Sequence, residues 1–414
     1  MEGEARTHER EVKGALRKAL LAEPFLASRY SFSPYMACGH GCAYCDGRAE
    51  RYWVEGEFDR DIVVRTNIAA LLDQELLRLR ERAPVSVGSG ISDAYQPVEA
   101  SLGLMRQAAL SLLRHRYPAS ILTKSALISR DLDLWSGVNA AGGFNLYVSL
   151  VYADDGLRKI FEPGASPVGE RAATMGAFKA AGCGVGVYAM PLLPWISDTP
   201  EAVGRLLDLC RSVGADFVMP GGLTLRPGRQ KDFFMGRLRS HFPELVPRYE
   251  ELYRENRPSG NCILAYRKEL YPRLGRAIEE AGFAAEIPHR LYRGRMPLYD
   301  ELHVLLCHMV GMYERRGTDV GRLRVAADRY RSWLTARKRL FNRRRRETQE
   351  GLEEELRVEL AEKRLDGLLD NVKLADFLRQ VALERRVFDY ASLRLQEAQP
   401  RAEAAIPWPS RSPA

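Results

Sequence analysis

The chain has 414 residues, enough for one large α/β domain and an accessory region. Apolar residues make up 46% of the sequence and charged residues 28%, which is typical of a globular protein and excludes wholesale disorder. The net charge of +8 permits an acidic partner such as nucleic acid without identifying one. No apolar run is long enough to span a membrane, and the N-terminus is charged, so we expect a cytoplasmic protein with no membrane partner.

Residues 2–22 have the pattern of an amphipathic helix, so residues 1–25 are predicted to form an N-terminal helix. Short β-rich runs then alternate with helical patterns. The predicted strands are residues 30–35, 85–88, 120–123, 144–150, 184–193 and 216–220. The clearest predicted helices are residues 68–79, 102–116, 170–181 and 202–213.

This alternation indicates parallel βα units. Six strands are fewer than the eight of a closed barrel, so we predict an α/β fold with an open partial (βα)6 barrel over residues 26–258. Residues 259–398 have almost entirely helical periodicity and are predicted to form an added all-helical C-terminal region. Residues 399–414 are rich in Pro, Ser and Ala, and we expect them to be disordered.

Three of the seven cysteines, Cys38, Cys42 and Cys45, follow the first predicted strand with the spacing C-x3-C-x2-C. An odd count and this crowding are typical of metal ligation rather than of disulfides. Three thiolates on a four-iron cluster would leave one iron open to another ligand. A zinc site, with His40 as a possible fourth ligand, is the alternative.

The other four cysteines are isolated in apolar or helical patterns, and we interpret them as buried small hydrophobic residues. They are Cys183, Cys210, Cys262 and Cys307.

A C-x3-C-x-aromatic-C motif after the first strand of a partial barrel resembles the radical S-adenosylmethionine (SAM) superfamily. The resemblance implies a [4Fe-4S] cluster on the three cysteines and reductive cleavage of SAM to methionine and a 5′-deoxyadenosyl radical, which abstracts a substrate hydrogen. It also implies an electron donor such as flavodoxin or ferredoxin. Tyr44 matches the aromatic residue that lies near the adenine in that superfamily.

Further segments resemble the branch related to spore photoproduct lyase, often labelled DNA repair photolyase. In order along the chain they are residues 88–99, 120–125, 130–134 and 161–166, and the resemblance covers roughly residues 26–225. Within it, Lys124 matches a lysine near the SAM carboxylate and Ser149 a hydroxyl near SAM. Ser92 and Asp93 belong to the segment that faces the SAM amino end.

Each of these residues also has a purely structural interpretation. Lys124 could be a solvated lysine at a strand end, and Ser149 a strand-terminal serine. Asp93 could form a turn with the two residues that follow it. Arg171 either pairs with a carboxylate or lies on a helix face.

One position departs from the branch. Spore photoproduct lyase has a hydrogen-donating cysteine just before the Ser-Asp pair, where this chain has Gly90 and Ile91, and no cysteine lies between Cys45 and Cys183. We expect Cys183 to be packed in the core rather than to replace that donor.

Residues 329–346 contain nine basic residues and no acidic one, interleaved with Tyr330, Trp333 and Phe341. Such a run can neutralise phosphates and stack on bases. The alternative is structural: residues 347–364 carry seven glutamates, so an acidic helix could pair with the basic one in a hairpin.

Three hypotheses follow. The first is a radical SAM enzyme that acts on nucleic acid. The second keeps the radical chemistry but acts on a small molecule or peptide, and it is favoured if the C-terminal helices close a small pocket over the barrel mouth. The third is a nucleic-acid-binding protein with a structural metal site.

Overall fold

The computed structural model describes residues 5–88, 90–344 and 346–398. Its main sheet has seven strands in the order β10-β9-β8-β7-β6-β3-β2. The strands β3 (Ser28–Phe32), β6 (Val85–Val87), β7 (Ala119–Thr123), β8 (Phe144–Ser149), β9 (Gly184–Leu192) and β10 (Phe217–Gly222) are parallel to one another. Consecutive βα units therefore place neighbouring strands side by side, which is the predicted open six-unit barrel.

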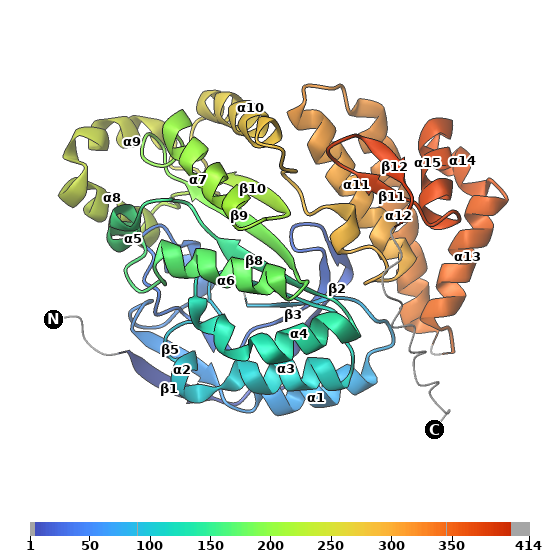
Figure 1. Cartoon of the computed structure of the whole chain (residues 1–414), viewed down its shortest axis with the longest axis horizontal. Helices are drawn as coiled ribbons and strands as arrows, with labels where there is room; N and C mark the ends of the chain where they lie inside the picture. The colour runs from blue at the N-terminus through green and yellow to red at the C-terminus, as the bar shows by residue number, and fades with distance from the viewer. Residues whose placement is uncertain (1–4, 89, 345, 399–414) are drawn as a thin grey trace.

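The helices between these strands are α1 (Ile68–Arg78), α2 (Glu99–Leu102), α3 (Leu104–Arg114), α4 (Leu132–Ala141), α5 (Asp155–Phe161), α6 (Val168–Ala180) and α7 (Pro200–Ser212), with the 3₁₀ helix η3 (Ala126–Asp131) before α4. Helices α3, α4 and α6 lie in front of the sheet in Figure 1. Phe144 of β8 packs between Trp135 of α4 and Phe178 of α6, with ring centroids 4.8 and 5.8 Å apart. The apolar face of each helix thus covers one face of the sheet.

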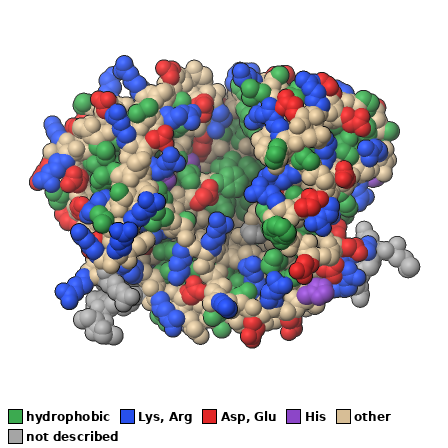
Figure 2. Space-filling model, turned by 180° about the vertical axis from the view of Figure 1, so that it is seen from behind, with side chains coloured by type: hydrophobic (Ala, Val, Ile, Leu, Met, Phe, Trp, Pro, Cys, Tyr) green, Lys and Arg blue, Asp and Glu red, His purple; other side chains and the backbone are tan. Residues whose placement is uncertain are grey.

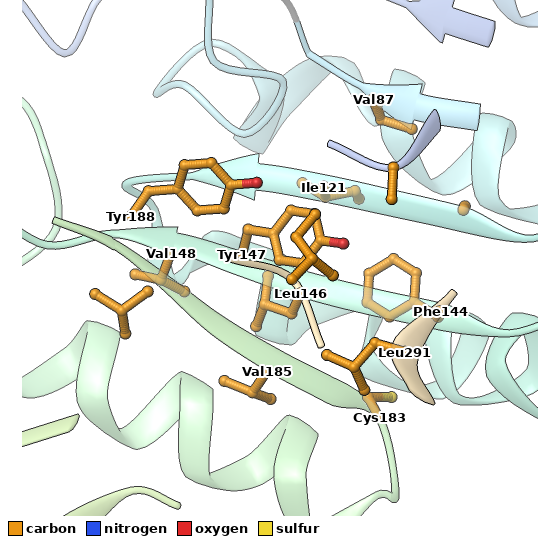
Figure 3. Packing of buried hydrophobic residues seen from close by; sticks show 14 of the residues in the cluster. Val87, Ile121, Phe144, Leu146, Tyr147, Val148, Cys183, Val185, Tyr188 and Leu291 are labelled. Atoms are coloured by element: carbon orange, nitrogen blue, oxygen red, sulfur yellow. The ribbon is translucent and has the colours of Figure 1, made fainter. Parts of the chain in front are cut away.

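The other face of the sheet carries an aromatic layer. The rings of Tyr147, Tyr188 and Phe217 lie 5.3 to 5.9 Å apart between centroids. Figure 3 shows Tyr147 and Tyr188 among these buried side chains, and it places Cys183 and Leu291 at the start of β9. This layer fills the barrel interior between β8, β9 and β10.

Three of the four isolated cysteines are buried as predicted, and Cys307 is not. Cys183, Cys210 and Cys262 are buried in apolar clusters, and Cys307 is half-buried. Cys183 immediately precedes β9, at the end of the sheet opposite the strand carboxyl ends. A nine-residue strand is about 30 Å long, so Cys183 lies far from those ends and is a packing residue.

The prediction of an N-terminal helix over residues 1–25 was wrong. The segment forms two strands: β1 (Arg6–Arg10) pairs in parallel with β5 (Asp61–Arg65), and β2 (Leu16–Glu23) pairs antiparallel with β3. A short strand, β4 (Tyr35–Met36), completes the small sheet β1-β5-β4. Helix propensity is a weak preference, and hydrogen bonding to the exposed edge of β3 outweighs it here.

Five further helical segments accompany the cysteine loop and the β10 side of the sheet. They are η1 (Asp46–Arg48), η2 (Glu50–Tyr52), α8 (Arg229–His241), η4 (Pro243–Leu245) and α9 (Val246–Leu252). Helix α10 (Leu264–Glu280) packs on β10 and α7 and adds its apolar residues to the barrel core. The boundary predicted at residue 258 therefore moves to the segment just before Leu298, where a separate apolar core begins.

The C-terminal region is helical as predicted, with one addition. It contains α11 (Leu298–Arg315), α12 (Gly321–Arg343), α13 (Gln349–Ala361), α14 (Arg364–Leu369) and α15 (Val372–Ala382), and the short η5 (His289–Leu291) precedes it. A hairpin of β11 (Val387–Asp389) and β12 (Arg394–Gln396) follows, whose three-residue strands are too short for periodicity to reveal. Residues 399–414, for which we expected disorder, lie outside the described residues.

Helices α11 and α12 pack against the edge strand β2. A buried charge cluster holds them there, since Arg29 of β3 pairs with Glu81 at 2.5 Å and with Asp300 of α11 at 3.3 Å, and Lys338 of α12 also pairs with Glu81. Arg29 and Glu81 lie near the amino ends of β3 and β6. In Figure 1 the C-terminal helices accordingly lie on the right and α5, α8 and α9 on the left.

Figure 2 views the molecule from the side opposite the βα helices and shows a hollow near the middle of that face, with hydrophobic side chains at its base. The C-terminal helices flank this hollow and do not cover the strand carboxyl ends. Among the described helices, none combines the length and apolarity needed to cross a bilayer.

Candidate active site around the cysteine loop

The three cysteines lie in the loop between β4 and η1, beyond the carboxyl end of β3. Cys38 and Cys42 are buried and Cys45 is half-buried. Two tight backbone turns wind the loop, with Gly41 N–H donating to the Cys38 carbonyl at 3.2 Å and Cys45 N–H to the Cys42 carbonyl at 3.3 Å. Gly41 has a φ of +63°, a left-handed conformation that glycine adopts without strain.

Two buried polar side chains hold the loop. The Gln96 carbonyl oxygen accepts from Gly39 N–H at 2.7 Å, and its amide nitrogen donates to the Ala37 carbonyl at 3.3 Å. The Arg48 guanidinium donates to the carbonyls of Gly41 and Cys42, both at 2.9 Å, and pairs with Asp59 at 2.8 Å. The loop backbone is therefore preorganised by the chain itself.

A second loop, residues 161–166, closes over the first. Ala43 N–H donates to the Phe161 carbonyl at 2.8 Å, and Gly164 N–H donates to the His40 carbonyl at 2.9 Å. A Cβ on Gly164 would lie 2.4 Å from the Gly39 carbonyl oxygen, so only glycine allows this approach.

Glu162 of that loop connects Tyr44 to Arg171. The Tyr44 hydroxyl donates to Glu162, and Arg171 donates to Glu162 at 2.5 Å and to the carbonyls of Ser149 and Ser166 at 2.9 and 2.8 Å. The structure therefore confirms that Arg171 pairs with a carboxylate, which was one of its two interpretations. Both members are almost wholly buried, with Glu162 0% and Arg171 1% exposed, which makes the pair costly to break.

Lys124 follows the carboxyl end of β7 and is half-buried; its ammonium lies 5.7 Å from the centre of the Tyr44 ring. Burial lowers the pKa of Lys124, but the Cys42 sulfur and Glu162 raise it by more, so the side chain is a cation. No described carboxylate forms an ion pair with it. Lys124 is thus a half-buried positive charge beside Tyr44 and Cys42.

Asp93 has hydrogen-bond partners within the chain. One carboxylate oxygen accepts from Tyr95 N–H at 2.9 Å and from the Thr123 hydroxyl at 2.7 Å, and the other accepts from Lys124 N–H at 2.7 Å. His40 lies against the same carboxylate, with Nδ1 at 3.4 Å. Asp93 therefore forms the turn anticipated as its structural interpretation and joins the ends of β6 and β7.

The two serines lie at the same end of the sheet. Ser149 is the last residue of β8 and is buried, and its carbonyl accepts from Arg171. Ser92 is buried beside Gln96, with its hydroxyl 3.5 Å from the Gln96 amide nitrogen. The chain thus gathers the cysteines, Tyr44, Lys124 and both serines around the carboxyl ends of β3 to β8.

Burial raises the pKa of all three thiols, that of Cys38 to about 12. Lys124 opposes this effect at Cys42 and Cys45, and Arg48 opposes it at Cys45. Metal ligation needs thiolates, so these nearby cations favour the ligating form, and binding would release protons.

The Tyr152 hydroxyl indicates whether a cofactor could be accommodated beside the cysteine loop. It is buried, it lacks a hydrogen-bond partner among the described residues, and it shares an apolar cluster with Cys42, Ala43 and Tyr44. An unsatisfied buried hydroxyl costs about 1–3 kcal/mol. A bound group with acceptor atoms beside Cys42 would remove that cost, so the residues present fit a cofactor here.

No set of three or more described His, Cys, Asp or Glu side chains is placed to hold a single metal ion. A four-iron cluster makes no such demand, because each thiolate binds a different iron.

Sequence reasoning missed Arg48, Gln96 and the role of Glu162. Gln96 and Glu162 lie inside the segments that resemble the branch related to spore photoproduct lyase. Their position there could have indicated that they contribute to the site. Nothing in the local sequence distinguishes Arg48 from other arginines, because its partners are backbone carbonyls that only the folded loop presents.

Comparison with known proteins gives relatives of unassigned function, and no family model matches the chain. The uncharacterized protein Rv2578c of Mycobacterium tuberculosis is 37% identical over 254 residues, which span 60% of this chain and 73% of that protein. The uncharacterized protein MJ0683 of Methanocaldococcus jannaschii is 24% identical over 234 residues, 56% of this chain and 84% of that protein.

Among solved structures, the fold is similar to that of spore photoproduct lyase complexed with dinucleoside spore photoproduct, with 16% identity, a TM-score of 0.46, and coverage of 61% of this chain and 74% of that one. Streptococcus suis SuiB bound to S-adenosylmethionine has 15% identity and a TM-score of 0.35, with coverage of 53% and 48%.

Proposed function

This chain belongs to the family of the uncharacterized mycobacterial protein Rv2578c, and we propose that it is a radical SAM enzyme with a [4Fe-4S] cluster on Cys38, Cys42 and Cys45. One observation carries the proposal: three cysteines in a preorganised loop lie beyond the first strand of an open six-unit βα barrel. Tyr44 and the Lys124 cation lie beside the loop, as the sequence resemblance anticipates.

The chain's own residues have separate tasks in this proposal. Gln96 and Arg48 fix the loop so that the thiolates keep their spacing. Glu162 holds the Tyr44 ring at the place where the adenine would lie. Lys124 is the cation suited to the SAM carboxylate. When bound, the reduced cluster supplies the electron that cleaves SAM to methionine and a 5′-deoxyadenosyl radical, with flavodoxin or ferredoxin as the kind of donor required.

For the substrate, we propose nucleic acid. The C-terminal helices pack on β2 and near the amino ends of β3 and β6, so they do not form a small closed pocket over the strand carboxyl ends. An open approach suits a large substrate better than a small molecule, which usually needs an enclosed site.

The test is an anaerobic assay for 5′-deoxyadenosine after reconstitution with iron and sulfide, reduction and addition of SAM. We expect the wild type and Cys183→Ala to form it and Cys42→Ala to lose it, because only Cys42 is a cluster ligand in this proposal. No product from a protein with an intact reduced cluster would overturn the radical chemistry. Zinc at one equivalent, with no cluster, would instead favour a structural metal site.

A second arm of the same assay addresses the substrate. UV-irradiated DNA, undamaged DNA and RNA are added in turn, and stimulation by any of them supports the nucleic-acid proposal. Equal rates with and without all three would favour the small-molecule or peptide alternative.

A further inference from the structure

The C-terminal ends of α1 and α12 meet at one place on the surface. There Arg80 donates to the carbonyls of Phe341 and Arg344, both at 3.0 Å, and to that of Glu347 at 2.6 Å. Its guanidinium carbon lies 4.1 Å from the centre of the Phe341 ring. The contact gathers several exposed arginines, which we call the arginine junction: Arg78, Arg80, Arg339, Arg343, Arg344 and Arg346.

The junction has few carboxylates. In the parts of the chain that the structure describes, Arg344 pairs with Glu347 at 2.8 Å, and the other five junction arginines have no carboxylate within ion-pair distance. Earlier in α12 the situation differs, since Arg329 pairs with Asp370 at 3.3 Å and Arg337 pairs with Glu355 of α13. The predicted pairing of the basic run with residues 347–364 is thus found at Arg337, and Arg329 pairs instead with Asp370 beyond that segment.

The aromatic residues of the run expose little ring surface to a ligand of the junction. Tyr330 and Phe341 are fully buried in the C-terminal core, and Trp333 is half-buried beside it. A ligand of the junction would therefore be held mainly by guanidinium groups, which donate paired hydrogen bonds to phosphate oxygens. Contacts of this kind hold a phosphate backbone without reading base sequence.

We propose that the arginine junction binds the phosphate backbone of a nucleic acid. The clustering of like charges is unfavourable without a counterion, and a polyanion relieves it. The exposed arginines are spread over two helix ends, which suits spaced phosphates better than one small anion. This inference deepens the proposed function by assigning part of the substrate contact.

The junction and the cysteine loop lie at opposite ends of the sheet. The α1 end leads into the amino end of β6, whereas the loop lies beyond the strand carboxyl ends, so strands of five or six residues separate them by at least about 17–20 Å. Each nucleotide of a duplex strand advances about 3.4 Å. A dinucleotide at the site cannot reach the junction, but an oligonucleotide of about ten residues can. Figure 2 shows Lys and Arg side chains along the lower left of the hollowed face, the side of the C-terminal helices.

The experiment measures binding of a 20-mer DNA duplex and the matching single-stranded RNA by fluorescence anisotropy at several salt concentrations, with metal-free protein. The test variant is Arg339→Ala/Arg343→Ala/Arg346→Ala. The control variant, Arg205→Ala/Lys268→Ala/Arg276→Ala, removes the same charge from exposed positions on α7 and α10 that also lack described ion pairs. A third variant replaces the same three junction arginines by lysine.

We expect the test variant to bind the duplex at least about tenfold more weakly at 0.1 M salt and to lower the salt slope by roughly three, since each phosphate contact contributes about 0.9. The control and lysine variants should keep most of the wild-type slope. 5′-Deoxyadenosine formation without nucleic acid should be the same in all four proteins.

Absence of wild-type binding to either nucleic acid would overturn the inference, as would equal losses in the test and control variants. Binding of an acidic protein with no binding of DNA or RNA would do so as well. Because the binding assay uses no cluster, its outcome is independent of whether the radical chemistry is correct.

Discussion

Glycines 41 and 164 shape the cysteine loop for different physical reasons. Gly41 adopts a left-handed backbone conformation, whereas Gly164 leaves room for the 161–166 loop to touch the Gly39 carbonyl. Gly41 is required by the backbone conformation of its own turn. Gly164 is required by a close contact between segments that lie more than a hundred residues apart in the sequence.

Gly164→Ala should therefore impair cofactor uptake. The added methyl group meets backbone atoms that cannot move aside, so the two loops must separate, and we expect iron incorporation per chain to fall by at least half with a loss of stability of about 1–3 kcal/mol. Gly169→Ala is the matched control, because a Cβ there meets no atom within 4 Å and alanine favours a helix. Equal iron content in the two variants would show that the close approach does not matter.

At the scale of elements, α12 has two functions along its length. Lys338 is fully buried against Glu81 and Asp300, and the next residue, Arg339, is exposed at the junction. A helix turns by about 100° per residue, so neighbouring basic residues point to different environments. The basic run is thus partly a core contact and partly a surface.

Lys338→Ala should destabilise the protein by about 1.5–3 kcal/mol, because it removes one of the two cations that compensate the buried carboxylates of Glu81 and Asp300 and leaves Arg29 as the other. Arg339→Ala should change the free energy of unfolding by less than about 0.5 kcal/mol. Denaturant unfolding of both variants checks this. Similar values for the two would mean that the buried cluster contributes little.

At the scale of the whole molecule, the cluster of Arg29, Glu81, Asp300 and Lys338 joins the barrel to the C-terminal helices. Burial alone would raise the pKa of Glu81, but Arg29 and Lys338 outweigh it and lower this pKa to about 2. Burial lowers the pKa of Lys338 by more than the two carboxylates raise it, whereas Asp300 and Glu81 hold the pKa of Arg29 above its usual value.

This shift predicts how stability depends on pH. The Glu81 pKa is lower in the folded than in the unfolded state, so its contribution of about 3 kcal/mol is complete above about pH 5 and is lost as pH falls toward 2. Glu81→Gln should be less stable at pH 7 and should lose less stability between pH 5 and 2. Parallel pH profiles for the two proteins would contradict the assignment.

The sequence alone was enough to predict the barrel and the place of the cysteine loop in it, but not all of the surrounding structure. Alternating strand and helix patterns identified the six parallel strands, because a buried parallel strand is a short apolar run with clear limits. The same patterns did not predict the strands of the N-terminal segment, because pairing with the edge of β3 decides the conformation of β2. The sequence predicted correctly that Asp93 lies at the carboxyl ends of the strands. Only the structure shows that its carboxylate already accepts hydrogen bonds from Tyr95, Thr123 and Lys124.

The sequence by itself determined the βα rhythm, the helical character of the C-terminal region and the cysteine spacing, because these are local patterns of polarity and ligand type. Tertiary structure alone decided that β2 is a strand, that Glu162 joins Tyr44 to Arg171, and that Lys338 is buried while Arg339 is exposed. Such outcomes depend on which distant groups compete for each hydrogen bond and charge, and a one-dimensional pattern does not contain those partners.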